Sequence, residues 1–474
     1  AFPNRAEMLR LAASAFATLS SVRVDPAHSH RIARKQAQLA RVMGLCAFPD
    51  ARASLARVLL SPGATTELNV EHRTPDFGAA RIEVVLPETT TVDGGMLRVS
   101  DTASPSDPYP DSYDPLAPSA PALAVTITAH GTTATSHIRF DTPPLIAPAL
   151  RAQLSCTGAI LNLAEPGRQV VLTISDASTG TPLFELPEGW QQRWTGAEVT
   201  LCVPDDVAGD VPGDVAEGLY SLPLMLDGKP AHSLRVFDQA HITPRLRSTP
   251  AILNVRVTTI ALPQARIAYI GAGNDQAATW LAAIGCTVTE LNDADLAGAN
   301  PFADYNCVLI GVFAMRFRPR LLSLMPALHE WVRAGGNLVT LYHRPWDNWD
   351  PDTVPPARLE IGQPSLRWRV TDETAEVRHL APEHPILTTP NTIDADVWQG
   401  WHKERGLYFA KSWDPAYTPL LAMSDAGEDP LHGALLSARI GQGRHTHVAL
   451  ILHHQMAQLV PGAFRLMANI LQPD

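Results

Sequence analysis

Residues 266–275 read RIAYIGAGND, and this stretch decides the fold of the second half of the chain. The apolar run 266–270 predicts a strand, and a helix through Trp280 follows the turn and ends at Gly285. The turn lacks the third glycine of a dinucleotide-binding fingerprint and the acidic residue that should follow it. We therefore expect a tight turn into a helix and no bound NAD.

The same pattern of strands and helices continues to the end of the chain. Further strands are predicted at 287–291, 307–311, 337–342 and 445–452, and a closing helix at 463–471. The run CVLIG at 307–311 is almost continuously apolar, as in a strand that is covered on both faces. Because strands alternate with helices, we expect right-handed crossovers and a mainly parallel sheet in an α/β domain over residues 262–474.

Upstream of this domain the hydrophobic period changes to two. TELNVE (66–71) and RIEVV (81–85) alternate between apolar and polar residues. Short strands of this kind, separated by Gly, Pro and Asp turns, predict two immunoglobulin-like β-sandwich modules over residues 59–150 and 151–255. The segment 101–122, rich in Pro, Asp and Ser, is expected to be a surface loop of the first module.

The first 58 residues predict a helical segment of two short helices. Asn4 with Glu7 starts the first helix, Asp25-Pro26 starts the second, and Gly44 is expected to end it. Two helices this short have no core of their own, so we expect them to pack on the next module or on a part upstream. The chain begins AFPN, without an initiator Met or a signal peptide, so we expect further polypeptide upstream.

The composition of the 474 residues is that of a globular protein, with 45% hydrophobic and 18% charged residues. The net charge of −11 argues against nucleic acid or an anionic membrane as the main partner. No apolar run reaches the length of about 20 residues that a membrane span needs. The five cysteines form no CxxC motif. Cys156 and Cys202 could pair if the protein is exported, but small buried hydrophobes explain all five better.

Six segments of the C-terminal half resemble the C-terminal region of large bacterial PIG-L-type (LmbE-like) deacetylases. They are IAYIGAGND (267–275), RVTDETAEV (369–377), EHPILTTPNTI (383–393), WHKERGLYF (401–409), GRHTHVAL (443–450) and VPGAFRLMANIL (460–471). The resemblance implies a zinc-dependent N-deacetylase that acts on an N-acetylglucosamine-type sugar. In that family the catalytic domain precedes these modules and carries an AHPDDE-like motif. Members of this architecture are often exported, which favours the periplasm or the exterior.

The metal motif of that family is missing from this sequence. It contains neither HPDD nor HPDE and no later His-x-x-His pair. A zinc hydrolase needs three protein ligands, an open position for water and a carboxylate base. We therefore expect no cofactor in this chain, and zinc only in an upstream PIG-L catalytic domain or chain.

The α/β domain is also similar to the class I glutamine-amidotransferase and trehalose-utilisation folds, and a flavodoxin-like or glutamine-amidotransferase-like domain is the fold we expect. Active members place a Cys on a strained turn after the strand that corresponds to 337–342. Here that turn reads Tyr342-His343-Arg344-Pro345, without Cys or Ser. An imidazole does not replace a thiolate in acyl transfer, so we expect no catalytic triad.

Two groups of polar and aromatic residues are candidates for substrate binding. The first, Arg344, Trp346 and Asp347, follows a predicted parallel strand at its carboxyl end, where open α/β sheets bind ligands. The second group comprises Arg369, Asp372, Glu373, Trp401 and Arg405. The alternatives are a packed structural loop for the first group and an internal ion-pair network for the second. Six of the ten tryptophans lie between Trp346 and Trp413, which suits sugar contact and a well-filled core equally.

Three residues are candidate catalytic groups: His343, His384 and Glu404, with His384 as the general base. His445 and His447 project from one face of a predicted strand. We expect them to be exposed histidines of a structural strand rather than metal ligands, because no carboxylate or Cys accompanies them.

Three functions remain open. The first is an accessory, non-catalytic C-terminal portion of a PIG-L-type carbohydrate N-deacetylase that aids substrate binding or assembly. The second is an independent carbohydrate-binding or cell-envelope assembly protein. The third is an autonomous hydrolase that uses His343, His384 and Glu404.

Overall fold

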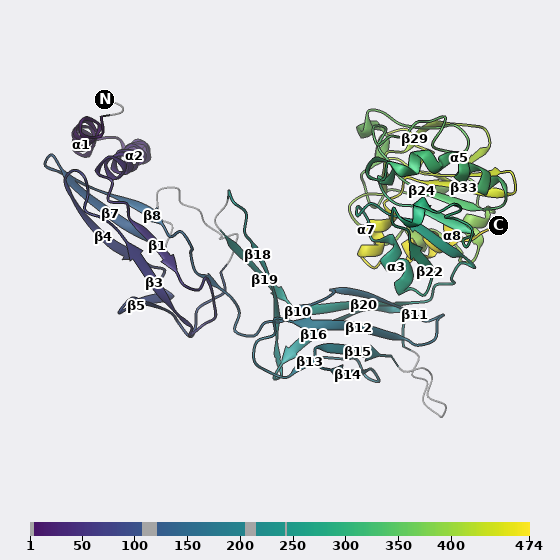
Figure 1. Cartoon of the computed structure of the whole chain (residues 1–474), viewed down its shortest axis with the longest axis horizontal. Coiled ribbons are helices and arrows are strands. Elements are labelled where there is room, and N and C mark those ends of the chain that lie inside the picture. The colour runs from purple at the N-terminus through teal and green to yellow at the C-terminus, as the bar shows by residue number, and fades with distance from the viewer. Residues whose placement is uncertain (1–3, 107–120, 204–214, 242–243) are drawn as a thin grey trace. The chain divides into compact units, whose positions relative to one another are not determined.

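The computed structural model describes residues 4–106, 121–203, 215–241 and 244–474 of a multidomain, mostly β chain (Figure 1). Unit 1 comprises Ala1–Leu154, Ile174–Leu183 and Pro223–Ala251, and unit 2 comprises Ser155–Thr173, Phe184–Leu222 and Ile252–Asp474. None of the described helices combines the length and the hydropathy that crossing a bilayer requires. Most of the loop predicted at 101–122 lies outside the described residues.

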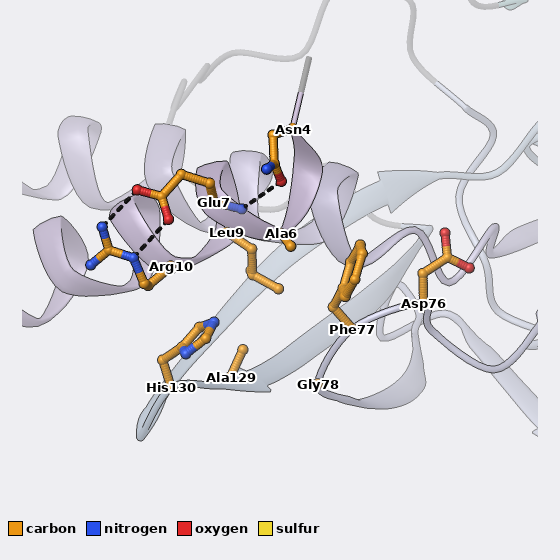
Figure 2. A pocket seen from close by; sticks show the side chains of 10 residues that line it. All are labelled: Asn4, Ala6, Glu7, Leu9, Arg10, Asp76, Phe77, Gly78, Ala129 and His130. Carbon is orange, nitrogen blue, oxygen red and sulfur yellow. Dashed lines mark hydrogen bonds and ion pairs between the residues drawn. The ribbon is translucent and has the colours of Figure 1, made fainter. Parts of the chain in front are cut away.

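Unit 1 begins with the two helices that the sequence predicts, α1 (Arg5–Ser21) and α2 (Ser29–Ala47), joined by the 3₁₀ turn η1 (Pro26–His28). The Asn4 side chain accepts a hydrogen bond from the Glu7 amide at 3.1 Å, as the capping pattern predicts (Figure 2). A hollow of about 610 Å³ lies beside this first turn and extends to His130.

The second helix does not end at Gly44, so that prediction is wrong. It continues to Ala47, and Phe48 ends it in the left-handed conformation with φ +52°. Gly44 has a packing role instead, because a Cβ there would lie 3.0 Å from the Ser136 hydroxyl of the neighbouring strand. A glycine inside a helix is tolerated where it allows such an approach.

The helices have no core of their own and pack on the module that follows them, as expected. Leu9, Ala13 and Met43 share one buried cluster with Leu123 and Ile127. The strand that supplies Leu123 and Ile127, β7 (Ala122–Ala129), is the centre of an antiparallel sheet between β4 (Ala79–Val85) and β8 (Thr132–Arg139). Burying one apolar stripe of each helix on this sheet supplies the hydrophobic stabilisation that two isolated short helices lack.

Antiparallel strands build the rest of unit 1. Their bounds are β1 (Arg52–Leu55), β2 (Leu59–Leu60), β3 (Thr65–Glu71), β4 (Ala79–Val85), β5 (Thr90–Asp93), β6 (Met96–Val99), β7 (Ala122–Ala129), β8 (Thr132–Arg139), β9 (Leu145–Ile146), β10 (Gln153–Leu154), β17 (Lys229–Pro230), β18 (His232–Phe237) and β19 (Arg245–Pro250). β1, β3, β6 and β5 form a second sheet, and β2 pairs in parallel with β9.

The middle of the chain is also β structure. Its strands are β11 (Gly158–Asn162), β12 (Gln169–Ser175), β13 (Pro182–Phe184), β14 (Gln191–Thr195), β15 (Glu198–Cys202), β16 (Gly218–Leu226) and β20 (Ile252–Thr258). Within unit 2, β15 pairs with β12 and β14, and β11 pairs in parallel with β20. All five cysteines are unpaired, so Cys156 and Cys202 form no disulfide here.

The side chain of Asn162 joins these strands to the C-terminal part of unit 2. Its amide nitrogen donates to the carbonyls of Ile260 (2.9 Å) and Ile284 (3.1 Å), and its oxygen accepts from the amide of Ile260 (2.9 Å). The group is buried with its donors and its acceptor engaged, which is the arrangement that makes a buried amide stabilising.

The C-terminal part is built on a seven-stranded sheet of order β22-β21-β23-β24-β33-β32-β30. The strands are β21 (Arg266–Ile270), β22 (Thr287–Glu290), β23 (Cys307–Ile310), β24 (Asn337–Leu341), β30 (Tyr417–Pro419), β32 (Leu435–Ile440) and β33 (Gly443–Val448). The first five in this order are parallel, and β32 and β30 are antiparallel additions at one edge. The sequence prediction of a mainly parallel sheet is confirmed.

Helices cover both faces of this sheet. They are α3 (Ala277–Ala283), α4 (Ala314–Phe317), α5 (Arg320–Arg333), α6 (Pro385–Thr388), α7 (Leu452–Ala457) and α8 (Pro461–Leu471). Cys307 and Leu309 of β23 share a buried cluster with Phe464 of α8, and Val308 shares another with Leu328 of α5. A strand buried on both faces needs apolar residues at every position, which is why its sequence is continuous rather than alternating.

Three short antiparallel pairs, each between strands that are distant in sequence, lie in the segment between β24 and β33. They are β25 (Leu359–Ile361) with β29 (Ala410–Trp413), β26 (Arg369–Val370) with β28 (Gly406–Leu407), and β27 (Arg378–His379) with β31 (Leu421–Ala422).

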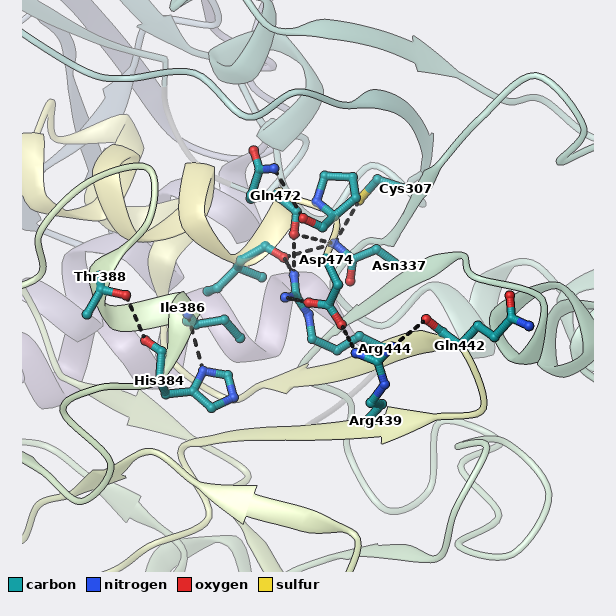
Figure 3. A network of polar contacts seen from close by, with 12 residues as sticks. Cys307, Asn337, His384, Ile386, Thr388, Arg439, Gln442, Arg444, Gln472 and Asp474 are labelled. Atoms are coloured by element: carbon teal, nitrogen blue, oxygen red, sulfur yellow. Dashed lines mark hydrogen bonds and ion pairs between the residues drawn. The ribbon is translucent and has the colours of Figure 1, made fainter.

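The amino ends of β23, β24 and β33 are closed by the last residues of the chain (Figure 3). Buried Arg444 donates to the carbonyls of Ile470 (3.1 Å) and Gln472 and pairs with the Asp474 carboxylate at 2.5 Å. Asn337 of β24 donates to the same Ile470 carbonyl at 3.1 Å. One guanidinium therefore satisfies several acceptors at the C-terminal end of α8, where a positive charge also interacts favourably with the helix dipole.

We expect Arg444→Met to lower the free energy of unfolding by about 3 kcal/mol, because it leaves buried acceptors without their charged donor. Arg439 supplies a matched control, since its exposed guanidinium (67%, against 6% for Arg444) contacts the same Asp474 side chain. Arg439→Met should cost about 0.5 kcal/mol or less. Urea unfolding of both variants measures the difference, and equal losses would contradict the buried role of Arg444.

Candidate functional site

Polar and aromatic side chains gather where the parallel strands end. β21 leads into the turn Gly271–Asp275, β23 into Gly311–Phe313, β24 into Tyr342–Asp347 and β33 into His453. These four carboxyl ends meet at one edge of the sheet, the position at which open α/β sheets bind ligands. We call this region the carboxyl edge.

A buried carboxylate orients a cation at the carboxyl edge. Asp347 is fully buried and accepts hydrogen bonds from the Arg344 side chain at Nε (2.9 Å) and Nη2 (2.7 Å), and from the Arg344 amide at 2.8 Å. This contact raises the pKa of Arg344 further above its ordinary value. Such a bidentate pair fixes the plane of the guanidinium and leaves it charged.

Four aromatic rings surround this guanidinium: Phe313, Tyr342, Trp346 and Tyr408. The Arg344 Cζ lies 4.2 Å from the Phe313 ring centroid and 5.8 Å from that of Trp346. Phe313 packs edge-to-face on Tyr342 at 5.4 Å, and Tyr408 lies 6.3 Å from Trp346. Trp346 is 55% exposed, so the group presents one large aromatic face to solvent.

Two further charges lie close to the same rings. Glu404 and Arg369 both interact electrostatically with Tyr408, as do Arg344 and Asp347. Burial raises the pKa of the half-buried Glu404 carboxyl, and the positive charges of Lys403 and Arg369 partly oppose this. Within the described parts of the chain, Arg369 makes no hydrogen bond or ion pair through its side chain, so its donors are available.

His453 borders the group from α7. Its Nε2 atom lies 3.3 Å from the Tyr342 hydroxyl, and its buried Nδ1 atom has no hydrogen-bond partner among the described residues. Burial, with the nearby His454 and Lys403, lowers the pKa of His453 to about 3. The imidazole is therefore neutral at physiological pH and able to donate or accept a hydrogen bond.

A strained strand-to-helix turn lies at the carboxyl edge after β23. Phe313 has φ +57°, which is rare for a bulky residue, and it precedes α4 directly. Asp275 supports the turn, because its carboxylate accepts from the Val312 amide (2.8 Å) and the Tyr269 hydroxyl (2.6 Å). In hydrolases a turn of this shape exposes the nucleophile. Here the side chain at its apex is a phenyl ring.

The loop after residues 337–342 does not form a turn of this shape at its start, because none of Tyr342, His343, Arg344 and Pro345 adopts positive φ. These four residues include neither Cys nor Ser, and the expectation that no catalytic triad is built there stays a prediction. Phe313 and Tyr408 were not predicted as site residues from the sequence. The only signal for Phe313 was that Gly311 directly follows a continuous apolar strand; Tyr408 and His453 reach the edge through contacts distant in sequence.

His343 is fully buried and both of its ring nitrogens are used. Nδ1 donates to the Leu341 carbonyl (2.8 Å), and Nε2 accepts from the Met315 amide (3.1 Å). Burial lowers the pKa of His343 to about 4. A histidine whose only lone pair already accepts a backbone hydrogen bond is not positioned to take a proton from a substrate.

His384 lies apart from His343 and Glu404. It caps α6, accepting from the Ile386 amide at 3.2 Å, and it is drawn in Figure 3 beside the network of Arg444 and Asp474. Burial and the charge of Arg444 lower its pKa. Since Arg444 begins β33 while His343 follows β24, the structure places the candidate catalytic residues at opposite edges of the sheet.

Arg405 and Trp401 are buried in the interior of the C-terminal part. Arg405 donates to the carbonyls of Trp398 (2.7 Å) and Ala375 (2.9 and 3.1 Å), and burial lowers its pKa to about 10. The Trp401 indole donates to the Val397 carbonyl at 3.0 Å. These contacts hold loops together, and neither side chain is free to meet a substrate.

Asp372 and Glu373 begin the loop that Arg405 holds. Exposed Asp372 accepts from the amide (2.8 Å) and hydroxyl (2.6 Å) of Thr374, which lowers its pKa. The Asp425 carboxylate in turn accepts from the amides of Thr371 (2.9 Å) and Asp372 (2.8 Å). Backbone contacts, rather than the expected ion pairs, therefore organise this second group.

The histidines of β33 are buried, so the expectation that they are exposed is wrong. His445 contacts the hydroxyls of Thr340 (3.1 Å) and Tyr417 (2.6 Å), and His447 contacts the same Thr340 hydroxyl (3.0 Å). Burial lowers the pKa of both, to about 3 for His447. They form a neutral polar network inside the face that α5 covers.

No group of three or more His, Cys, Asp and Glu side chains in the described ranges lies so as to hold a metal ion. The described residues therefore do not show the ligand set of a zinc hydrolase, and no step through zinc is assigned to them.

No protein-family model matches this chain, and no curated protein matches it. Among solved structures, it is similar to two cytoplasmic proteins from Salmonella typhimurium. One is 14% identical, with 44% of this chain and 97% of that chain covered and a TM-score of 0.31. The other is 12% identical, with 52% and 97% covered and a TM-score of 0.30. A β-galactosidase from Rahnella sp. R3 is 14% identical, with 44% and 32% covered and a TM-score of 0.25. At these TM-scores none of the three assigns a function.

The buried histidines predict a loss of stability in acid. His343 and His447 bind protons with pKa about 4 and about 3 in the folded chain, but with pKa about 6.5 once unfolded. Below pH 6.5 the unfolded state therefore binds more protons, and each such histidine costs about 1.4 kcal/mol per pH unit until its folded pKa is reached.

Urea unfolding at roughly pH 7.5 and pH 5 measures this slope. His447→Gln should reduce the pH dependence of the unfolding free energy by about 1.4 kcal/mol per pH unit, which corresponds to one bound proton. His28→Gln, which changes an exposed histidine of η1, should leave it unchanged. An unfolding free energy that does not fall between these pH values would contradict the burial of neutral imidazoles.

Proposed function

We propose that residues 262–474 form a non-catalytic carbohydrate-binding domain, and that the chain is the accessory C-terminal portion of a PIG-L-type N-deacetylase acting on N-acetylglucosamine-type sugars. The observation that carries the proposal is the exposed ring of Trp346 beside the oriented guanidinium of Arg344 at the carboxyl edge.

The chemistry of this edge suits a sugar ring. The apolar CH face of a pyranose stacks on an indole, and its hydroxyl groups need donors and acceptors around the rim. Trp346 offers the face, Arg344 and Arg369 offer donors, and Glu404 offers an acceptor. Asp347 pairs with Arg344 and lies 3.7 Å from Arg316, and Glu404 interacts with Arg369 and Lys403. The edge therefore offers both donors and an acceptor to a ligand rich in hydroxyl groups.

The same residues argue against hydrolysis by this chain. Phe313 occupies the apex of the strained turn and has no nucleophilic atom. His343 has both ring nitrogens engaged by the backbone, and His384 lies at the other edge of the sheet. Catalysis therefore belongs to the zinc-dependent domain that the family resemblance implies upstream.

We also propose a specific fold for the C-terminal domain and for the β modules that precede it. The parallel strand order β22-β21-β23-β24-β33 corresponds to second-first-third-fourth-fifth in chain order, which supports a flavodoxin-like or glutamine-amidotransferase-like domain. The antiparallel sheets of unit 1 and of the middle of the chain support immunoglobulin-like spacer modules. Export to the periplasm or exterior follows from the family resemblance alone.

Trp346→Ala should weaken binding of N,N′-diacetylchitobiose to the full chain at least about tenfold, because a stacked ring contributes roughly 1–3 kcal/mol. Isothermal titration calorimetry measures the affinity. Leu380→Ala, which truncates an exposed apolar residue outside the aromatic group, is the control and should bind like the wild type. Unchanged affinity in the Trp346 variant would show that the sugar does not bind at the carboxyl edge.

Purified chain should release no acetate from acetylated chitin oligosaccharides, since it has neither a nucleophile nor a set of metal ligands at the carboxyl edge. Chromatographic detection of acetate tests this directly. Acetate release that His384→Ala abolishes would instead establish the autonomous hydrolase and refute the accessory role.

A further inference from the structure

A cleft of about 860 Å³ lies in unit 2, away from the aromatic group of the carboxyl edge. Its walls come from β11 and β12 on one side and from α3 and the end of α7 on the other; Figure 1 shows these elements. None of the residues that line it belongs to the carboxyl-edge group. We call it the neutral cleft.

The neutral cleft carries no charge. Eighteen residues line it, and none of them is Asp, Glu, Lys, Arg or His. Its lining side chains therefore offer no counter-charge to an ionic ligand. An ion that is buried against neutral walls loses hydration free energy that uncharged side chains do not fully replace.

Uncharged side-chain amides are among the polar groups that line the cleft. In the described ranges the side-chain amides of Gln169, Gln276 and Gln458 have no hydrogen-bond partner. The Asn254 oxygen accepts from Ser221 at 2.8 Å, which leaves its NH₂ group unpaired. Uncharged amides both donate and accept, which is what a hydroxyl group requires.

Apolar surface alternates with these amides. Val171 of β12 and Leu219 of β16 are each 50% exposed in the wall, and the Trp280 ring lines it from α3. The Trp280 indole nitrogen is buried without a hydrogen-bond acceptor in the described structure. Exposed aliphatic and aromatic faces between unpaired amides match the alternating CH and OH surface of a sugar.

The walls of the cleft are held in place by polar contacts. Arg256 of β20 donates to the Leu459 carbonyl at 3.0 Å, and Asn162 ties β11 to the end of α3 through the Ile284 carbonyl. A cleft formed before the ligand arrives loses less conformational entropy on binding.

We propose that the neutral cleft is a second carbohydrate site, which takes an uncharged oligosaccharide. The proposal rests on the absence of charge, the unpaired amides and the exposed apolar walls of the cleft. It extends the proposed function, because a chain with two separate sugar sites can engage a polymer at two points and gain avidity.

Val171→Arg tests the proposal, because it places a long cation in the cleft from an exposed strand position that tolerates substitution. Val236→Arg is the matched control: Val236 is 47% exposed on β18, outside the cleft. The probes are cellotetraose, N,N′-diacetylchitobiose and the anionic tetragalacturonate, titrated into the full chain by calorimetry, with circular dichroism to verify the fold.

We expect at least one neutral probe to bind and tetragalacturonate not to bind at the cleft. In chains that also carry Trp346→Ala, which removes the carboxyl-edge site, Val171→Arg should weaken neutral-probe binding at least tenfold relative to Val236→Arg. Trp280→Phe, which keeps an aromatic face but replaces the indole by a smaller ring without an N–H group, should weaken binding less. Equal affinities of the two arginine variants, or no binding of either neutral probe, would overturn the second site.

The Trp346→Ala variant separates this proposal from the carboxyl-edge function. If binding is lost in Trp346→Ala and kept in Val171→Arg, the carboxyl edge stands and the neutral cleft falls. If binding is kept in Trp346→Ala and lost in Val171→Arg, the reverse holds. Two-site titration curves that each variant reduces to a single site would support both.

Discussion

The burial of the parallel sheet on both faces is the constraint from which the rest of the C-terminal part follows. Side chains on strands that are buried on both faces meet packed helices and not a ligand, so the side chains that can reach a ligand are confined to the strand ends. The amino edge is closed by Arg444, which binds the last carbonyls of the chain and Asp474. The carboxyl edge is left to carry the polar and aromatic group.

The electrostatics of that edge favour binding over catalysis. Asp347 is buried and its carboxylate is held in the ion pair with Arg344, so it is not positioned to act as a base. Glu404 is balanced by nearby cations, and His453 is neutral. A site whose carboxylates already face cations offers donors and acceptors to hydroxyl groups, but it leaves no carboxylate unopposed to act as a base.

The sequence reveals the sheet better than the site. The apolar run 307–311 predicts a doubly covered strand because burial on both faces imposes composition directly. The site depends on contacts between distant segments, which no local pattern records. The sequence therefore did not indicate Tyr408 as a site residue, and it predicted a substrate-binding role for Trp401, which the structure buries. Positive φ at Phe313 and the burial of His343 are set by tertiary packing, so composition and spacing could not reveal them.

A crystal structure of the full chain soaked with N,N′-diacetylchitobiose tests the central claim most directly. The account predicts an intact disaccharide with one pyranose ring stacked on Trp346 and hydroxyl groups within hydrogen-bond distance of Arg344 or Glu404. A deacetylated product, or a carboxyl edge that stays empty while sugar occupies only the surroundings of His384, would contradict it.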